Sequence, residues 1–228
     1  MSAPVSVIVP TLNAADTIGP CLSALAEGAF DGLVAELILV DGGSSDSIAE
    51  LAEGVGARLI KAPQGRGSQL SAGADAARST WMLFIHADTV LPPGWPSVFR
   101  AHIERGASRA GYAGLAFDST DRMARVTERW ANLRSRLFAL PYGDQGLLIH
   151  RDLYRAVGGY DAIPLMEDVA LVRRLGRNRL TRLAVTATTA ATRYERDGWT
   201  RRGARNLSTL ALYYLGWRAE TLAKRYRR

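Results

Sequence analysis

Acidic side chains stand at three points of the sequence where they could take part in catalysis. Asp41 and Asp88 each follow an apolar segment typical of a buried strand, and the pair Glu167-Asp168 stands at the start of a helical pattern. In α/β proteins, ligands bind beyond the carboxyl ends of the parallel strands, where such side chains would meet. Carboxylates gathered there can hold a divalent cation or accept a proton from a hydroxyl group. A single acid in such a place could equally well cap the next helix.

Asp41 has competitors for that capping role. Ser44, Ser45 and Asp46 are all suitable N-caps for the helix that follows. Gly42 leaves the backbone beside Asp41 open to close approach by a ligand. We therefore interpret Asp41 and Gly42 as ligand-binding residues.

Two glycine-rich segments carry polar side chains that a ligand could contact. In the first, Arg66 stands between two glycines and Gln69 follows one turn later, so that Arg66 could meet a phosphate or a base. The alternative is a turn with a solvated arginine. In the second, Gly143, Asp144 and Gln145 precede an apolar segment, and glycine and aspartate are ordinary turn formers. No turn requires Gln145, which favours a function for this segment.

The elements that must position these residues alternate between short apolar runs and helical patterns, as in a parallel sheet with crossover helices. Strands are expected at residues 5–9, 37–40, 58–61, 81–85, 112–117, 147–150 and 185–192. Helices are expected at residues 16–26, 68–78, 122–137, 167–175 and 200–225, and two more end near residues 54 and 105. The spacing is less regular after Asp88, and we expect that half to form the second wall of a cleft.

The composition is that of a globular protein, with 228 residues of which 47% are hydrophobic and 22% charged, and it predicts one compact domain. No apolar run approaches the roughly 20 residues of a membrane span. No basic and then apolar pattern opens the chain, so we expect no secretory signal. The single cysteine, Cys21, fits a reducing compartment. These features predict a cytoplasmic protein.

The net charge of +7 is confined to one end of the chain. Residues 1–195 hold 20 basic and 20 acidic side chains, whereas residues 196–228 hold nine basic and two acidic ones. A neutral body with a basic end indicates a local electrostatic surface. Residues 206–217 are uncharged, rich in large apolar side chains and flanked by arginines. This segment could pack on the body or on a second subunit, and the cationic tail at residues 224–228 could dock on the anionic inner face of the cell membrane.

Four motifs in order resemble those of the family 2 glycosyltransferases. They are VSVIVPTLN at residues 5–13, ELILVDGGSSD at 36–46, GADAA leading to FIHAD at 73–88, and MED at 166–168. Each motif is weak alone, whereas four in order with consistent spacing are specific. The resemblance covers residues 5–175, and the HAD and GDQG variants look most like those of the small stand-alone bacterial members.

The resemblance implies a GT-A fold, that is, a single α/β domain with a mostly parallel central sheet flanked by helices, plus a C-terminal helix. Residues 1–195 would be this domain, with a nucleotide-binding half at 1–90 and an acceptor-side half at 91–195. Residues 196–228 would be a basic helical extension. The implied reaction transfers a sugar from a nucleotide-diphosphate sugar to an acceptor hydroxyl, with inversion at the anomeric carbon.

The resemblance also assigns roles in that reaction. Asp88 would hold Mn²⁺ or Mg²⁺, which neutralises the leaving diphosphate. Asp168 would be the general base, and Glu167 would orient the acceptor or raise the pKa of Asp168. His86 stands where the family usually has an acid, and it would contact the ribose or hold the metal, in which case Mn²⁺ is favoured. No late histidine offers a further ligand, so water or a side chain near Thr192 would complete the shell.

The other motif residues would bind the two substrates. Asp41 resembles the family acid that reads a base N–H, which favours uracil and hence a UDP-sugar. The donor-side residues implied are Pro10, Thr11, Asn13, Asp41, Gly42, Arg66, Gln69 and His86, and the acceptor-side residues are Gly143, Asp144 and Gln145. Three aromatic residues could line a sugar or lipid surface, although such side chains are more often core: Trp130, Phe138 and Tyr142.

Other functions fit the sequence less well. A sugar-phosphate nucleotidyltransferase would need a basic glycine-rich loop directly after the first strand, and a dinucleotide dehydrogenase would need Gly-x-Gly-x-x-Gly there. A nucleic-acid or anionic-surface binding module that uses the basic C-terminus would leave Asp41, Asp88 and Asp168 unexplained. We therefore expect no specific nucleic-acid partner. The sequence leaves open the sugar, the acceptor and the oligomeric state, with a homodimer among the states that it allows.

Overall fold

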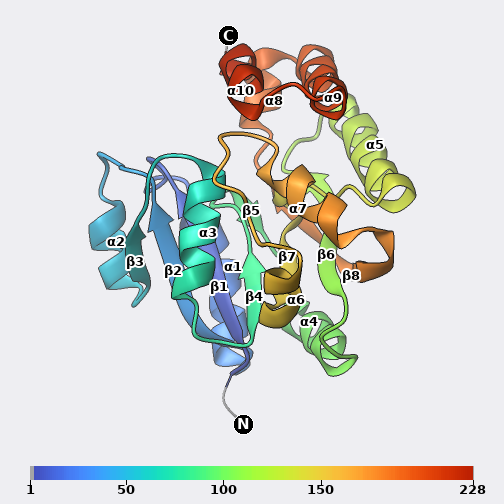
Figure 1. Cartoon of the computed structure of the whole chain (residues 1–228). Helices are drawn as coiled ribbons and strands as arrows, with labels where there is room; N and C mark the ends of the chain where they lie inside the picture. The colour runs from blue at the N-terminus through green and yellow to red at the C-terminus, as the bar shows by residue number, and fades with distance from the viewer. Residues whose placement is uncertain (1–2, 228) are drawn as a thin grey trace.

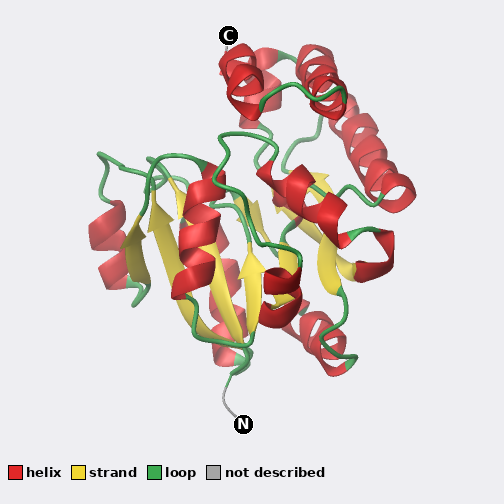
Figure 2. Ribbon diagram, in the orientation of Figure 1, coloured by secondary structure: helices red, strands yellow, loops and turns green. Residues whose placement is uncertain are grey.

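The computed structural model describes residues 3–227, and Arg228, part of the predicted cationic tail, lies outside them. One sheet of eight strands runs through the molecule in the order β3-β2-β1-β4-β7-β6-β8-β5 (Figure 1). Helices cover both faces of this sheet (Figure 2). The expected α/β architecture is therefore present.

The first half of the chain builds the parallel part of the sheet. Buried residues dominate two of its strands, at 5–11 and 81–84, and the end of a third, at 34–41, as parallel strands with helical crossovers require, whereas the edge strand at 58–61 is only partly buried. These elements are β1 (Val5–Thr11), α1 (Gly19–Phe30), β2 (Val34–Asp41), α2 (Ile48–Gly54), β3 (Arg58–Lys61), α3 (Arg66–Ala76) and β4 (Trp81–Phe84). Thr11 pairs with Asp41, and Asp41 with Lys61, so these strands end side by side at one edge.

The second half adds a mixed extension to that sheet. Strand β7 is antiparallel to both β4 and β6, β8 is parallel to β6, and β5 is antiparallel to β8. The elements are β5 (Thr89–Val90), α4 (Trp95–Glu104), β6 (Ala110–Phe117), α5 (Arg122–Phe138), the 3-10 turn η1 (Gly143–Gln145), β7 (Leu147–His150), α6 (Arg151–Ala156), α7 (Glu167–Leu175), the 3-10 turn η2 (Arg177–Arg179) and β8 (Leu180–Thr189).

The hydrophobic core lies on the two faces of the sheet. Along β1, Ile8 packs on one face with Leu70 of α3, while Val7 packs on the other with Trp95 of α4, as the two-residue period of a strand dictates. Gly73 lets α3 approach closely, because a Cβ there would lie 2.4 Å from Ile8 Cγ2. The start of α3, with Arg66, is thereby held at the edge where β1 and β2 end.

The C-terminal region departs from the sequence expectation. The last strand covers residues 180–189 instead of 185–192, because polar residues alternating with buried ones from Leu180 obscured its start. The single helix expected at 200–225 is wrong: the chain forms α8 (Thr192–Asp197), α9 (Trp199–Tyr214) and α10 (Ala219–Arg227). Gly216, at φ +86°, turns the chain between α9 and α10. In Figure 1 these helices lie beyond the carboxyl ends of the parallel strands.

Several other boundaries differ from the expected ones by a few residues. Helix α1 begins at Gly19 and not at residue 16, because Pro20 is placed in its first turn. The N-cap of α2 is Ser47, which makes no side-chain capping bond. None of the helices in residues 3–227 combines the length and the apolar character needed to cross a membrane.

Candidate active site

Two adjoining cavities lie at the carboxyl edge of the sheet. The inner chamber, of about 140 Å³, is lined by Asp88, Asp144, Glu167 and Asp168 together with surrounding residues. The outer cleft, of about 540 Å³, is lined by residues that follow β1 and precede α3. Seven residues line both cavities and mark where they join: Arg66, His86, Asp88, Leu165, Glu167, Arg193 and Tyr226. Residues that are far apart in the sequence thus share one site.

The segment after β4 carries His86 and Asp88 into this junction. Ile85 N–H donates to Ile8 O, and Ala190 N–H donates to Asp88 O at 3.2 Å, so the backbone of the segment is held between β1 and the end of β8. The His86 ring lies against Gly143, where a Cβ would be 2.5 Å from Nε2. Burial, and then the nearby arginines 66 and 193, hold the pKa of His86 well below its usual range. The imidazole is therefore neutral at physiological pH.

The start of α7 presents Glu167 and Asp168 to the chamber. Met166, which precedes them, has φ +68°, a left-handed conformation that is uncommon for a side chain of this size. Asp168 Oδ2 accepts from Gly143 N–H at 2.9 Å, and Oδ1 accepts from Val169 N–H at 2.7 Å. The positive end of the helix dipole favours negative charge on such residues. The Asp168 carboxylate is thus fixed in orientation.

Two further carboxyl groups of the chamber hold protons more tightly than usual. Glu167 is 3% exposed, and its burial, followed by repulsion from Asp168, raises its pKa to about 7. Burial likewise raises the pKa of Asp144 to about 6, against the opposing effect of the Arg134 guanidinium. Asp144 Oδ1 has no hydrogen-bond partner among the described residues. Near neutral pH the chamber therefore carries less negative charge than its four carboxyl groups would give in water.

Arg66 and Arg193 supply positive charge to the same place. Both line the chamber and the cleft, and neither forms an ion pair with any acid that the structure describes. Burial and then the neighbouring Arg66 lower the pKa of Arg193. Arginines held without a partner at a cleft are suited to an anionic ligand such as a phosphate group. Arg193 was not predicted as a site residue, because no motif contains it and its place on α8, after β8 ends at Thr189, differs from the expected strand at 185–192.

The C-terminal helices also line the chamber, which the sequence did not indicate. Arg202 donates to Asp197 at 2.8 Å and to the hydroxyl of Tyr226 at 3.1 Å. The Tyr226 hydroxyl donates to Asn206 at 2.7 Å, and Asn206 donates to the hydroxyl of Tyr194 at 2.9 Å. These contacts join α8, α9 and α10 into one unit. No sequence signal marked them, because the spacing of the polar residues becomes meaningful only when the helices are folded together.

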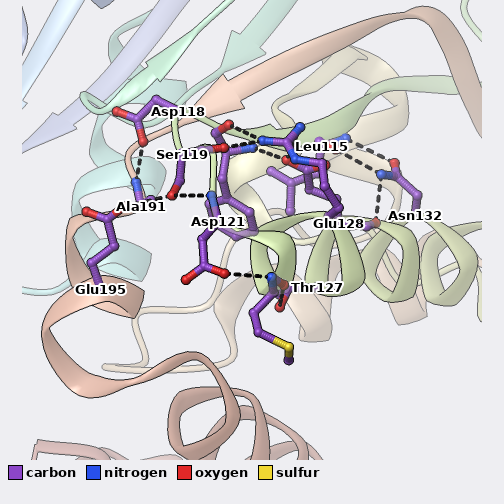
Figure 3. A network of polar contacts seen from close by, with 12 residues as sticks. Leu115, Asp118, Ser119, Asp121, Thr127, Glu128, Asn132, Ala191 and Glu195 are labelled. Atoms are coloured by element: carbon purple, nitrogen blue, oxygen red, sulfur yellow. Dashed lines mark hydrogen bonds and ion pairs between the residues drawn. The ribbon is translucent and has the colours of Figure 1, made fainter.

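A polar network fixes α8 to the sheet, as Figure 3 shows. Asp118 accepts from the backbone N–H of Ala191 at 2.6 Å, and Ser119 donates to Glu195 at 2.8 Å. On α5, Glu128 accepts from Phe117 N–H, and Asn132 exchanges hydrogen bonds with the backbone of Leu115. The loop after β6 thus connects α5 to the start of α8. This connection positions Arg193 and Tyr194.

Several predicted donor-side residues surround the outer cleft. Pro10, Thr11, Asn13, Arg66, Gln69 and His86 line it. Gln69 is buried, and its Nε2 donates to Thr11 O at 2.8 Å and to Val40 O at 2.7 Å, which joins the ends of β1 and β2. Thr11 Oγ1 is buried without a hydrogen-bond partner among the described residues.

The remaining predicted residues lie outside the lining of the two cavities. Asp41 accepts from Gly43 N–H and from the backbone and hydroxyl of Ser44, and it organises its own loop. Gly42 lies against the Gln69 amide. Gln145 is buried, accepts from Ser135 and donates to Ala113 O at 2.9 Å. By contrast, the acceptor-side residues Gly143 and Asp144 line the chamber.

The donor set of the chamber fits a divalent cation that the substrate helps to bind. No group of three or more His, Cys, Asp or Glu among the described side chains could hold a metal ion by itself. Asp88 and the neutral His86 nevertheless both line the junction, and Asp144, whose Oδ1 is unpaired among the described residues, lines the same chamber. Magnesium-type sites commonly use one or two protein carboxylates and take other ligands from substrate phosphates and water. The residues present fit such a site.

The family of the chain is decided by its sequence. A family model described as Glycosyl transferase family 2 matches residues 6–152, well over half of the chain. The chain belongs to glycosyltransferase family 2. The predicted family is confirmed.

Curated members of the family are similar over part of their length. The chain is 39% identical over 99 residues to a PGL/p-HBAD biosynthesis glycosyltransferase of Mycobacterium tuberculosis, covering 40% of this chain and 38% of that protein. It is 33% identical over 97 residues to the glucosyl-3-phosphoglycerate synthase of Mycolicibacterium paratuberculosis, covering 39% and 29%. The chain thus matches less than two fifths of the length of these relatives.

Solved structures establish the fold. TarS 1–349 of S. aureus superposes with a TM-score of 0.66 at 18% identity, over 84% of this chain and 61% of that one. The M. tuberculosis glucosyl-3-phosphoglycerate synthase in complex with Mn²⁺, UDP and glucosyl-3-phosphoglycerate superposes with a TM-score of 0.55 at 22% identity, over 82% and 70%. The predicted GT-A fold class is confirmed.

Proposed function

We propose that the protein is an inverting, metal-dependent glycosyltransferase that moves a sugar from a nucleotide-diphosphate sugar, favouring UDP, to an acceptor hydroxyl. The observation that carries the proposal is the inner chamber, where Asp88 from the segment after β4 and Asp168 from the start of α7 line one cavity together with Arg66 and Arg193. Family membership supports it, as does the binding of UDP and Mn²⁺ by a structural neighbour of the same fold.

The outer cleft is proposed to hold the nucleoside. Pro10 and Thr11 end β1 at its floor, and the unpaired Thr11 Oγ1 is available to a hydrogen-bonding group of the ligand. Arg66 and Arg193, at the junction with the chamber, are suited to the diphosphate. Asp41 already accepts bonds from its own loop. The uracil-reading role that the resemblance gives to Asp41 therefore requires one of those bonds to be exchanged for the base.

Asp88 and His86 are the proposed metal-holding residues. When bound there, Mn²⁺ or Mg²⁺ would neutralise charge on the leaving diphosphate. The neutral imidazole of His86 can act as a ligand, which favours Mn²⁺. The partly protonated Glu167 and Asp144 reduce the repulsion that an anionic diphosphate would meet in this chamber.

Asp168 is the proposed base. Its two oxygens accept from Gly143 and Val169, and a carboxylate has lone pairs left for the proton of an acceptor hydroxyl. The hydroxyl oxygen would form the bond to the anomeric carbon while the bond to the diphosphate breaks on the opposite face, and Asp168 takes the proton. Glu167 lies beside it and orients the acceptor.

Two measurements separate donor binding from chemistry. Calorimetry with UDP and Mn²⁺ should show lost affinity in Asp88→Asn, while Asp168→Asn and the exposed control Asp152→Asn bind like the wild type. Transfer should fall by about 10²- to 10⁴-fold in Asp168→Asn, the usual contribution of a general base. Equal UDP affinity in Asp88→Asn and the wild type would refute the metal role. A product with the anomeric configuration of the donor would refute inversion.

The donor nucleotide can be identified by thermal shift. UDP, GDP, CDP and dTDP are compared with and without Mn²⁺, because a ligand at 100 times its Kd stabilises by about 2.7 kcal/mol. The largest stabilisation is expected for UDP with Mn²⁺. A larger effect of another nucleotide would contradict the uridine preference while leaving the reaction class intact.

A further inference from the structure

An apolar groove lies between α5 and α9, directly beside the inner chamber. It has a volume of about 520 Å³ and is bordered by side chains from both helices. Four residues line both the groove and the chamber: Tyr142, Asp144, Tyr194 and Asn206. The groove is therefore continuous with the cavity that contains the proposed base, and it shares no lining residue with the outer cleft.

The mouth of this α5–α9 groove exposes large apolar side chains to solvent. Trp130 and Phe138 of α5 are 48% and 61% exposed, and Leu207 and Tyr214 of α9 are 54% and 48% exposed. Beyond the mouth, on the turn after α9, Leu215 is 76% exposed. Contiguous exposed apolar surface of this kind marks a binding site for an apolar partner.

The inner end of the groove is polar. The guanidinium of Arg134 is buried and lies 3.4 Å from the centroid of the Tyr142 ring. Its Nη2 atom has no hydrogen-bond partner among the described residues, nor has Oδ1 of the neighbouring Asp144. Buried polar atoms without partners are costly, and a polar group of a ligand would satisfy them. The groove therefore suits a molecule with an apolar body and a polar head.

Building on the proposed glycosyltransferase function, we propose that the α5–α9 groove binds the hydrocarbon chain of a lipid acceptor, whose hydroxyl-bearing headgroup enters the chamber next to Asp168. Continuity with the chamber assigns the occupant to the acceptor, because the donor has the outer cleft. The open apolar mouth favours a lipid over a small polar sugar, since a chain can extend past the protein into a membrane. Exposed cations on α9, on α10 and on the connection between them complement an anionic membrane surface: Arg201, Arg218, Lys224 and Arg225.

The groove is tested with an apolar fluorescent probe and lipid mimics of graded length. N-phenyl-1-naphthylamine is bound to the full chain and displaced by hexyl, heptyl, octyl and nonyl β-D-glucosides below their critical micelle concentrations. Burial of each added methylene should tighten displacement about three- to fourfold. Leu207→Glu, at the groove mouth, should weaken probe binding at least tenfold. Leu215→Glu, an exposed leucine of the same region outside the groove lining, is the matched control and should bind like the wild type.

Three results would overturn the lipid proposal. The first is displacement of the probe that does not depend on the chain length of the glucoside. The second is equal probe affinity in Leu207→Glu and the wild type. The third is an equal loss of probe affinity in both glutamate variants, which would mean adsorption to the whole apolar surface. Sedimentation equilibrium adds a fourth: a wild-type dimer that Leu207→Glu converts to a monomer would place a second copy on the groove. UDP binding with Mn²⁺ is measured in the same samples. If the wild type binds neither UDP nor GDP, CDP or dTDP with Mn²⁺, the proposed function is refuted separately, without altering the groove result.

Discussion

Removing the charge of Glu167 should stabilise the protein in alkaline solution. The native carboxyl has its pKa raised to about 7 from an ordinary 4.5, first by burial and then by repulsion from Asp168. Because the pKa is higher in the native state than in the unfolded chain, the protonated form favours folding. The resulting stability is fully present below pH 4.5 and is lost as the pH rises through 7. Glutamine at this position cannot ionise, so Glu167→Gln escapes the loss.

The size of the effect follows from the two pKa values. Each pH unit between them is worth about 1.4 kcal/mol, so the gain at pH 8.5 should approach about 3 kcal/mol, and less than about 1 kcal/mol should remain at pH 4.5. For a chain of this length, about 3 kcal/mol corresponds to a rise in Tm of roughly 6–12 °C.

Urea denaturation at pH 4.5 and pH 8.5, with chelator present and nucleotide absent, measures the difference. Glu53→Gln, which removes an exposed carboxylate of α2, is the control and should change stability little at either pH. A gain for Glu167→Gln that is equal at both pH values would point to packing and not to charge. If Glu167→Gln is less stable than the wild type at pH 8.5, the explanation by a buried carboxylate with a raised pKa is refuted.

Three other changes probe the donor side, the junction of β1 and β2, and the basic end. Arg193→Ala should weaken UDP binding about 10- to 100-fold, the worth of a charged hydrogen bond, whereas the exposed Arg201→Ala should not; equal calorimetric affinities would exclude a phosphate contact. Gln69→Leu should lower the free energy of unfolding in urea by about 1–3 kcal/mol, because it removes the buried side chain that donates to both Thr11 O and Val40 O, and an unchanged midpoint would contradict this bridging role. Sedimentation with anionic vesicles at low salt should carry the wild type down but not the double reversal Lys224→Glu with Arg225→Glu, since each cation contributes about 1 kcal/mol; binding of both proteins, or of neither, would refute electrostatic docking.

The sequence by itself determined the class of the fold and the approximate place of most strands and helices. The strands at residues 58–61 and 147–150 and the helix at 167–175 match the structure at both ends. The apolar patterns of these segments and the short connections beside them favour one secondary structure over the others. The family motifs, read in order, were enough to identify the family that the sequence model confirms. They also predicted roles for Asp88 and Asp168, which the structure brings to one chamber.

Only the tertiary structure decided that the C-terminal region lines the candidate active site. Its charge pattern indicated a basic appendage, yet Arg202 and Tyr226 line the chamber through contacts among three helices. Arg193 joins Arg66 because β8 ends and α3 begins at the same edge of the sheet, although these residues are far apart in the sequence. The raised pKa of Glu167 likewise arises from burial by distant segments. Local patterns encode strands, helices and motifs. The burial of a side chain and the electrostatic field around it depend instead on all of its neighbours, which come together only when the chain is folded.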